Sequence, residues 1–286
     1  MSPVPRWSAG RQARLASVNP RTLELTISYD GTRLVGWQRQ AEGESVQGLL
    51  EEALARLEGA PVTVHGAGRT DAGVHALAQV ASVQLTCEHP PEVLQRALNA
   101  SLPCDVRVVN VREADAAFHA RFSARAKTYR YVLCNGPFVS PFEHRYVWHV
   151  REPLDLDAMQ AAAQTLVGTH DFAAFCSSGS TPTTTVRTIV RSSMTTRAGS
   201  ALLLPPGAPG AVQAGRVDES TLLVYEVIGN GFLRHMVRAI VGTLVDIGRG
   251  RHPPAWMAAL LEDGRRSDAG ATAPAQGLFL VRVDYY

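Results

Sequence analysis

The chain has 286 residues, of which 45 % are hydrophobic and 19 % are charged, as is usual for a folded globular protein. No apolar run approaches the roughly 20 residues of a membrane-spanning helix, and no apolar stretch follows the N-terminal arginines as it would in a secretory signal. We therefore expect a cytoplasmic protein that has no membrane partner. The formal net charge is only +2, so any binding of nucleic acid must come from local basic patches.

The first half of the chain begins with a polar segment, residues 1–20, whose lack of periodicity predicts a disordered tail. Beyond it, apolar residues recur with the period of strands or of helices. The expected elements are a strand over 23–29, a helix over 46–57, a short strand over 62–64, a strand over 77–85, a helix over 91–99 and a strand over 105–111. Ser45 is the expected cap of the first helix. This half is therefore predicted to be β-α-β-β-α-β.

The second half shows strands and helices in a similar order, which indicates a duplicated α+β unit. The expected elements are a strand around 129–133, a helix over 155–167, strands over 185–195 and 220–229, helices over 232–245 and 254–263, and a strand over 278–285. The segment 198–217 is rich in Ala, Gly and Pro, which predicts a flexible insertion between two strands.

The sequence G-A-G-R-T-D-A-G-V-H at residues 66–75 is the most informative stretch. It fails as the G-x-G-x-x-G turn of a nucleotide-dependent dehydrogenase, because Asp71 occupies the third glycine position and would repel a pyrophosphate. A turn of small residues instead allows a ligand to approach the backbone. Arg69 is expected to pair with Asp71 and to orient its carboxylate, which can act as a nucleophile or a general base. The alternative is that Asp71 only caps a turn.

Two basic stretches follow this motif in the sequence. Residues 119–130 contain four cations and no acidic residue, and residues 230–252 contain four arginines against one aspartate. The RNA-binding candidates from these stretches are Arg121, Arg125, Lys127, Arg130 and Arg234. Such stripes can follow a phosphate backbone, although a solvated charged face is the common alternative. Gln38 and Arg39 are further polar candidates for contacts with RNA.

Metal binding is not expected. The four cysteines form no C-x-x-C pair, and the nine histidines form no H-E-x-x-H motif. His170-Asp171 resembles half of a metal site, but no second such pair is present.

A set of motifs in fixed order resembles the tRNA pseudouridine synthase A (TruA) family. The matching stretches are Y-D-G at 29–31, G-W-Q-R-Q at 36–40, S-V-Q at 45–47, G-R-T-D-A-G-V-H-A at 68–76, F-H-A-R-F-S-A-R at 118–125, Y-R-Y at 129–131, G-T-H-D-F at 168–172, R-T-I at 187–189, H-M-V-R at 235–238, and A-P-A and G-L at 273–278. The resemblance therefore extends from about residue 22 to the C-terminus.

The resemblance implies a role for each of five side chains. Asp71 is the expected catalytic carboxylate, and Tyr129 is expected to pack against the target uracil. Arg238 is expected to pair with Asp71, since an arginine on the inner face of an apolar helix needs a partner. Arg69 is expected to fill the space that the extruded base vacates. Leu278 is expected to line the pocket, although core packing explains it equally well.

The resemblance also implies the fold, the substrate and the assembly. The expected fold is α+β, the pseudouridine synthase fold, with a catalytic lobe over 21–125 and a second lobe over 126–286. Their β-α-β-containing units are expected to form one joined mixed sheet with helices on its outer face and a central cleft. The implied activity is isomerisation of uridine at tRNA positions 38, 39 and 40, without a cofactor, by a homodimer. The alternative is an RNA-binding module of the same fold without catalytic activity.

Overall fold

The computed structural model describes residues 19–177, 179, 182–197 and 221–285. The predicted tail lies outside these residues except for its last two positions, and the predicted insertion over 198–217 lies wholly outside them.

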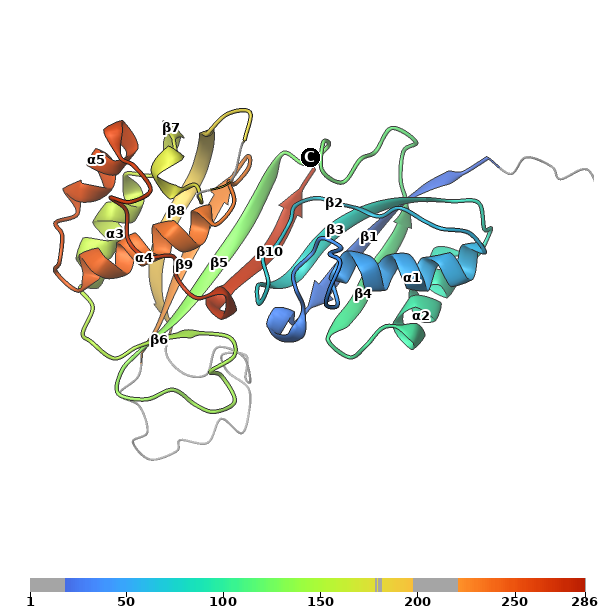
Figure 1. Cartoon of the computed structure of the whole chain (residues 1–286), viewed down its shortest axis with the longest axis horizontal. Coiled ribbons are helices and arrows are strands. Elements are labelled where there is room, and N and C mark those ends of the chain that lie inside the picture. Colours follow the sequence, from blue (N-terminus) through green and yellow to red (C-terminus); the bar gives the residue numbers. More distant parts are fainter. Residues whose placement is uncertain (1–18, 178, 180–181, 198–220, 286) are drawn as a thin grey trace, which may run out of the picture.

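The described chain forms one mixed sheet with helices packed on it, which confirms the predicted α+β class (Figure 1). The first half contributes β1 (Arg21–Tyr29), α1 (Val46–Glu58), β2 (His65–Gly66), β3 (His75–Leu85), α2 (Pro91–Ser101) and β4 (Val106–Glu113). The second half contributes β5 (Ala126–Asn135), β6 (Trp148–Val150), α3 (Leu156–Gln164), β7 (Gly168–Asp171), β8 (Val186–Arg197), β9 (Thr221–Gly229), α4 (Met236–Gly248), α5 (Ala255–Asp263) and β10 (Leu278–Asp284).

The last strand joins the two halves of the sheet. The strand order is β4-β1-β3-β10-β5-β9-β8-β7, with β2 paired to β3 and β6 paired to β5. β10 lies parallel to β3, with Phe279 opposite His75, and antiparallel to β5, with Leu278 opposite Tyr131. Because β3 follows the Asp71 turn directly, this pairing brings that turn beside β5, which carries Tyr129.

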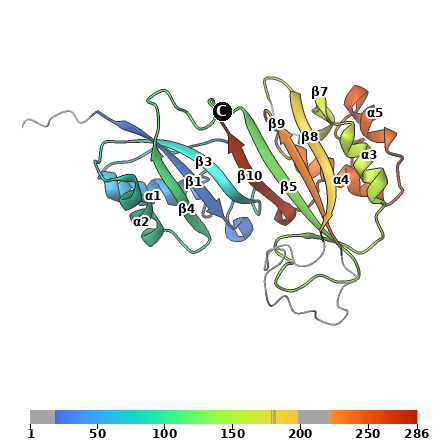
Figure 2. The ribbon, with the colours of Figure 1, turned by 180° about the vertical axis from the view of Figure 1, so that it is seen from behind.

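The helices cover one face of the sheet (Figures 1 and 2). Alternate residues of β1, namely Leu23, Leu25 and Ile27, point into the main core and are fully buried there, as the period-two pattern predicts. That core is continuous across both halves of the chain. A smaller apolar cluster around Val132 and Phe279 lies apart from it. No described helix has the length and apolar character needed to cross a membrane.

Several element boundaries differ from the prediction. The short strand lies at His65–Gly66 and not at 62–64, α3 ends at Gln164, and β6 and β7 were not expected. The long helix begins at Met236, four residues later than predicted, because His235 has a φ of 63°. A residue in the left-handed region cannot continue a right-handed helix, so the backbone turns sharply before α4.

Candidate active site

The Asp71 turn is held by close backbone packing against the 36–37 segment. Trp37 N donates to Thr70 O over 3.0 Å, and Gly36 has a φ of +105°. A Cβ on Gly36 would lie 2.5 Å from Thr70 O, and one on Gly66 would lie 2.4 Å from the Trp37 ring. Side chains therefore cannot be added here without moving the turn, which explains why glycines occupy these positions.

Hydrogen bonds from two buried polar side chains also hold this turn. The Tyr29 hydroxyl lies 2.7 Å from Thr70 Oγ1, and Gln79 Nε2 donates to Gly68 O over 2.8 Å. Burial raises the pKa of Tyr29 to about 12, with the hydrogen bond to Thr70 opposing the rise. Tyr29 is therefore a neutral hydrogen-bonding side chain at physiological pH, and it fixes the residue next to Asp71.

An arginine and a histidine of the second half converge on the Asp71 carboxylate. Arg238 Nη1 lies 3.3 Å from Oδ2, and His235 Nε2 lies 3.4 Å from the same oxygen. Arg238 also donates from Nε to Ala273 O over 2.7 Å, which fixes its guanidinium plane. Among the described residues, side-chain contacts reach only Oδ2, so Oδ1 remains available to a substrate. The Asp71 side chain is 29 % exposed.

The strained backbone at His235 supports this arrangement. It is the one described residue other than glycine with a positive φ, and such a conformation costs about 1–3 kcal/mol. Burial lowers the pKa of His235, the nearby Asp71 opposes that shift, and the charges of Arg238, Arg234 and Arg266 add to it. The imidazole is therefore mainly neutral at pH 7 and contacts Asp71 as a hydrogen-bonding ring.

Tyr129 lies on β5 at the wall of the same site. Its ring packs edge-on against Phe232 with centroids 4.9 Å apart. Burial raises the pKa of Tyr129 well above its usual range, and the negative charge of Asp71 adds to the rise. Tyr129 is therefore a neutral aromatic side chain at physiological pH.

Arg69 and Leu278 are the two remaining candidates from the family resemblance. Arg69 is exposed, and among the described residues it forms no ion pair with Asp71. The expected Arg69–Asp71 pair is therefore not formed among the described residues, where Arg238 and His235 contact the carboxylate instead. Leu278 is buried at the start of β10, opposite Tyr131, as part of the main core.

One group of RNA-binding candidates lies on the other side of the turn. Lys127 Nζ comes within 3.7 Å of the position that a Cβ on Gly68 would occupy. Burial lowers the pKa of Lys127 to about 8, and the charges of Arg121 and Arg187 contribute to the fall. Lys127, Arg121 and Arg187 therefore form a basic cluster next to the motif.

The remaining candidates lie elsewhere or have internal partners. Gln38 donates to Gln47 Oε1 over 2.9 Å, and Arg39 pairs with Glu51 and Glu52 over 3.2 and 3.1 Å. Arg125 is exposed in the connection before β5.

Arg130 does not belong to the same surface. It follows Tyr129 on a strand and therefore points to the opposite face of the sheet, where it pairs with Glu226 over 2.9 Å. The expectation that it lines the cleft with Lys127 was wrong. Arg234, in contrast, lines a hollow that also contains His235.

In the part of the chain that the structure describes, no group of three or more His, Cys, Asp or Glu side chains is arranged to hold a metal ion.

Comparison with known proteins identifies the family. A tRNA pseudouridine synthase family model matches residues 25–123 and 162–286. The chain is 46 % identical over 265 residues to tRNA pseudouridine synthase A of Pelobacter propionicus. The matched region covers 93 % of this chain and 100 % of that protein. It is 44 % identical to the enzyme of the same name from Syntrophotalea carbinolica, over 92 % of this chain and 96 % of that protein. The chain belongs to the tRNA pseudouridine synthase family.

This membership confirms the resemblance and the isomerase class expected from the motifs. It also gives context to three residues for which the sequence suggested no function. His235 and Arg187 lie within motifs that match the family, but the contact of His235 with Asp71 and the effect of the Arg187 charge on the pKa of Lys127 depend on folding. Arg266 carried no signal beyond its positive charge, and only the structure places it near His235.

Proposed function

We propose that this chain isomerises uridine to pseudouridine at positions 38, 39 and 40 of the tRNA anticodon stem-loop, with Asp71 as the catalytic carboxylate. The observation that carries the proposal is the asymmetric environment of that carboxylate. Arg238 and His235 both contact Oδ2, while Oδ1 is left for the substrate. A carboxylate that is oriented in this way and partly shielded from water is suited to attack or to proton removal.

The reaction breaks the bond from ribose C1′ to uracil N1 and forms a bond from C1′ to C5, while the C5 proton leaves and N1 gains a proton. Atoms and electrons balance within the substrate, so no cofactor is needed. The enzyme must extrude the target nucleotide from the stack, at a cost of a few kcal/mol. In this proposal the Tyr129 ring packs against the uracil, Leu278 supports the pocket floor, and Arg69 enters the space that the base leaves.

Substrate binding is proposed to use basic side chains on both sides of Asp71. Lys127 and Arg121 lie on one side and Arg234 on the other, so that an RNA backbone can pass over the carboxylate. We propose the lobes over 21–125 and 126–286 as the two walls of this cleft. A tRNA-modifying function further suggests the cytoplasm as the location.

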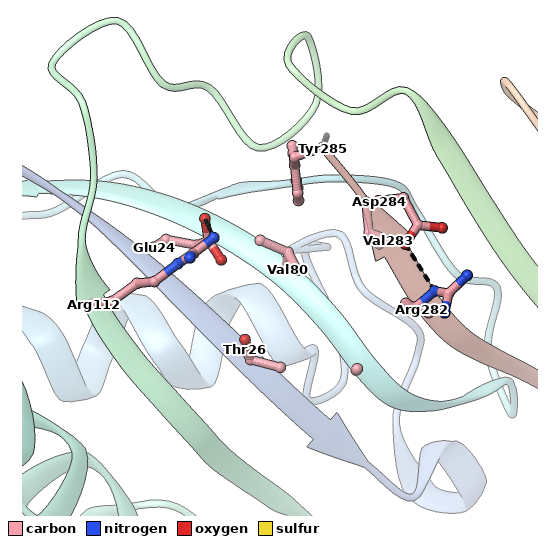
Figure 3. A pocket seen from close by; sticks show the side chains of 9 residues that line it. Glu24, Thr26, Val80, Arg112, Arg282, Val283, Asp284 and Tyr285 are labelled. Atoms are coloured by element: carbon pink, nitrogen blue, oxygen red, sulfur yellow. Dashed lines mark hydrogen bonds and ion pairs between the residues drawn. The ribbon is translucent and has the colours of Figure 1, made fainter.

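We also propose a homodimer, on the ground of the resemblance, with the helix-free face of the sheet as the contact surface. A hollow of about 340 Å³ lies on this face, and Figure 3 shows the side chains that line it. Its lining includes the ion pairs Arg112–Glu24 and Arg282–Asp284, each 2.8 Å long. Charges of both signs on one face suit a two-fold contact, in which an arginine of each copy can face a carboxylate of the other. Sedimentation equilibrium tests this, and a monomer at micromolar concentration would contradict it.

The substitution Asp71→Asn tests the catalytic assignment. It keeps the shape of the side chain and removes its nucleophilic and basic character, so tRNA binding should persist while pseudouridine formation falls below detection. Pseudouridine can be mapped in treated tRNA and the dissociation constant measured on the same protein. Activity that survives the substitution would refute the role of Asp71. A wild-type chain that binds tRNA and forms no pseudouridine would support the alternative, an RNA-binding module.

A further inference from the structure

A basic hollow lies immediately beside Asp71. It has a volume of about 500 Å³ and is lined by Ser177, Arg234, His235, Arg266, Ser267 and Thr272. His235 connects the two sites, because it lines the hollow and its Nε2 lies 3.4 Å from Asp71 Oδ2. A group bound here is therefore about one side chain away from the catalytic carboxylate.

Arg266, one of the residues that line this hollow, is held in a fixed orientation. Arg266 Nη1 donates to Gly270 O over 2.9 Å, and Nη2 donates to Thr272 Oγ1 over 2.7 Å. Both acceptors belong to its own loop and carry no formal charge. Within the described ranges, neither Arg266 nor Arg234 forms an ion pair with a carboxylate. Their positive charges are therefore not neutralised by the described protein.

The hollow also offers hydroxyl groups. Ser177 Oγ is buried and has no hydrogen-bond partner among the described atoms, which is costly unless a ligand or water satisfies it. Ser267 is already engaged, since its Oγ donates to Asp268 Oδ1 over 3.0 Å. Two guanidinium groups, an imidazole and a buried hydroxyl together match an anion with several acceptor oxygens.

We propose that this hollow is a phosphate subsite, which binds one of the two RNA phosphates that flank the target uridine. The inference rests on the proposed function, because it takes the nucleotide at Asp71 to be a uridine within an RNA chain. Each flanking phosphate is attached to the ribose whose C1′ reacts, so anchoring it fixes the sugar while the base is freed and turned. Arg266 and Arg234 contact the phosphate oxygens in this arrangement, and His235 lies between the phosphate and the carboxylate.

A double-mutant cycle between protein and RNA tests the subsite. Full-length tRNA is joined from synthetic pieces so that a single uncharged methylphosphonate replaces the phosphate on the 5′ or the 3′ side of the target uridine. Dissociation constants are measured for the wild-type chain and for Arg266→Gln. Neutralising the contacted phosphate should weaken wild-type binding about tenfold, as expected for one charge-assisted contact. It should weaken binding to Arg266→Gln less than twofold.

Arg265→Gln provides the matched control, because it removes an adjacent exposed arginine that does not line the hollow. This variant should retain the full tenfold response. Arg234→Gln is the second test variant if Arg266→Gln does not fold, and it should also reduce the response. Equal responses in the wild-type chain, Arg266→Gln and Arg234→Gln, at both phosphate positions, would overturn the subsite. Because the readout is affinity, this outcome is independent of whether Asp71→Asn abolishes pseudouridine formation.

Discussion

The substitution Arg238→Lys tests how the Asp71 carboxylate is held. Arg238 uses two different nitrogens at once, Nη1 for Asp71 and Nε for Ala273 O. A lysine has a single ammonium on a flexible stem and cannot reproduce this planar, two-point contact. The charge is therefore kept while the orientation of the Asp71 carboxylate is lost.

The expected fall in reaction rate follows from the distance between Arg238 and Asp71. Two unit charges 3.3 Å apart attract one another by about 5 kcal/mol at an effective dielectric constant of about 20. Exchange with water reduces the net value of a charge-assisted hydrogen bond to about 1.5–3 kcal/mol. We therefore expect the rate of pseudouridine formation to fall roughly 10- to 150-fold, with less effect on tRNA affinity.

Single-turnover pseudouridine formation at saturating enzyme measures this step separately from binding. Arg249→Lys is the matched control, because Arg249 directly follows α4, its side chain is 18 % exposed, and it pairs with Glu152 over 3.1 Å, far from Asp71 in the chain. It should lose a similar amount of stability and keep its turnover rate. If Arg238→Lys reacts within twofold of the wild-type rate while folded and saturated, the orienting role of the ion pair is refuted.

Two further predictions concern the walls of the site. Burial and neighbouring arginines lower the pKa of Lys127 to about 8, so the folded chain loses this charge between about pH 7 and 9 while the unfolded chain keeps it. The contribution of Lys127 to the free energy of unfolding therefore rises with pH up to about 10.5. Over the same range the affinity for tRNA should fall, because a positive charge beside the RNA is lost. Lys127→Arg should remove this affinity loss in filter-binding titrations, and an unchanged pH profile would contradict the assignment. Gly36→Ala should lower the free energy of unfolding by about 1–3 kcal/mol and also slow catalysis, because its Cβ would push on Thr70 O beside Asp71. Gly59→Ala is the control, because Gly59 has a φ of +75° but no atom lies within 4 Å of the added Cβ. It should lower the urea midpoint of unfolding without slowing catalysis. Equal rate losses in the two variants would argue against the effect of the Gly36 Cβ on Thr70 O.

The sequence predicted the order of most elements because their apolar residues recur with clear periods. Ser45 caps α1 through a bond from Gly48 N of 3.2 Å, as expected from its residue type and position. The Asp71–Arg238 pair joins residues 167 positions apart, and it was expected only because the motifs resemble a family. Periodicity gives no information about a contact of that separation.

The errors have physical causes. The Arg69 prediction took closeness in sequence for contact between side chains, whereas the described contacts of Asp71 come from Arg238 and His235. The Arg130 prediction counted all the charges along one strand as if they lay on one face of the sheet. Successive strand residues point to opposite faces, so Tyr129 and Arg130 lie on opposite sides. The role of His235 depends on a backbone angle that residue type does not specify.

The position of β10 between β3 and β5 has a consequence for biosynthesis. Residues 278–284 leave the ribosome after every other strand of this sheet. Until then the Asp71 turn and the wall that carries Tyr129 belong to two partial sheets that lack their common neighbour. A nascent chain therefore brings the Asp71 turn and the Tyr129 wall together only once β10 has been synthesised, after both halves have had time to fold separately.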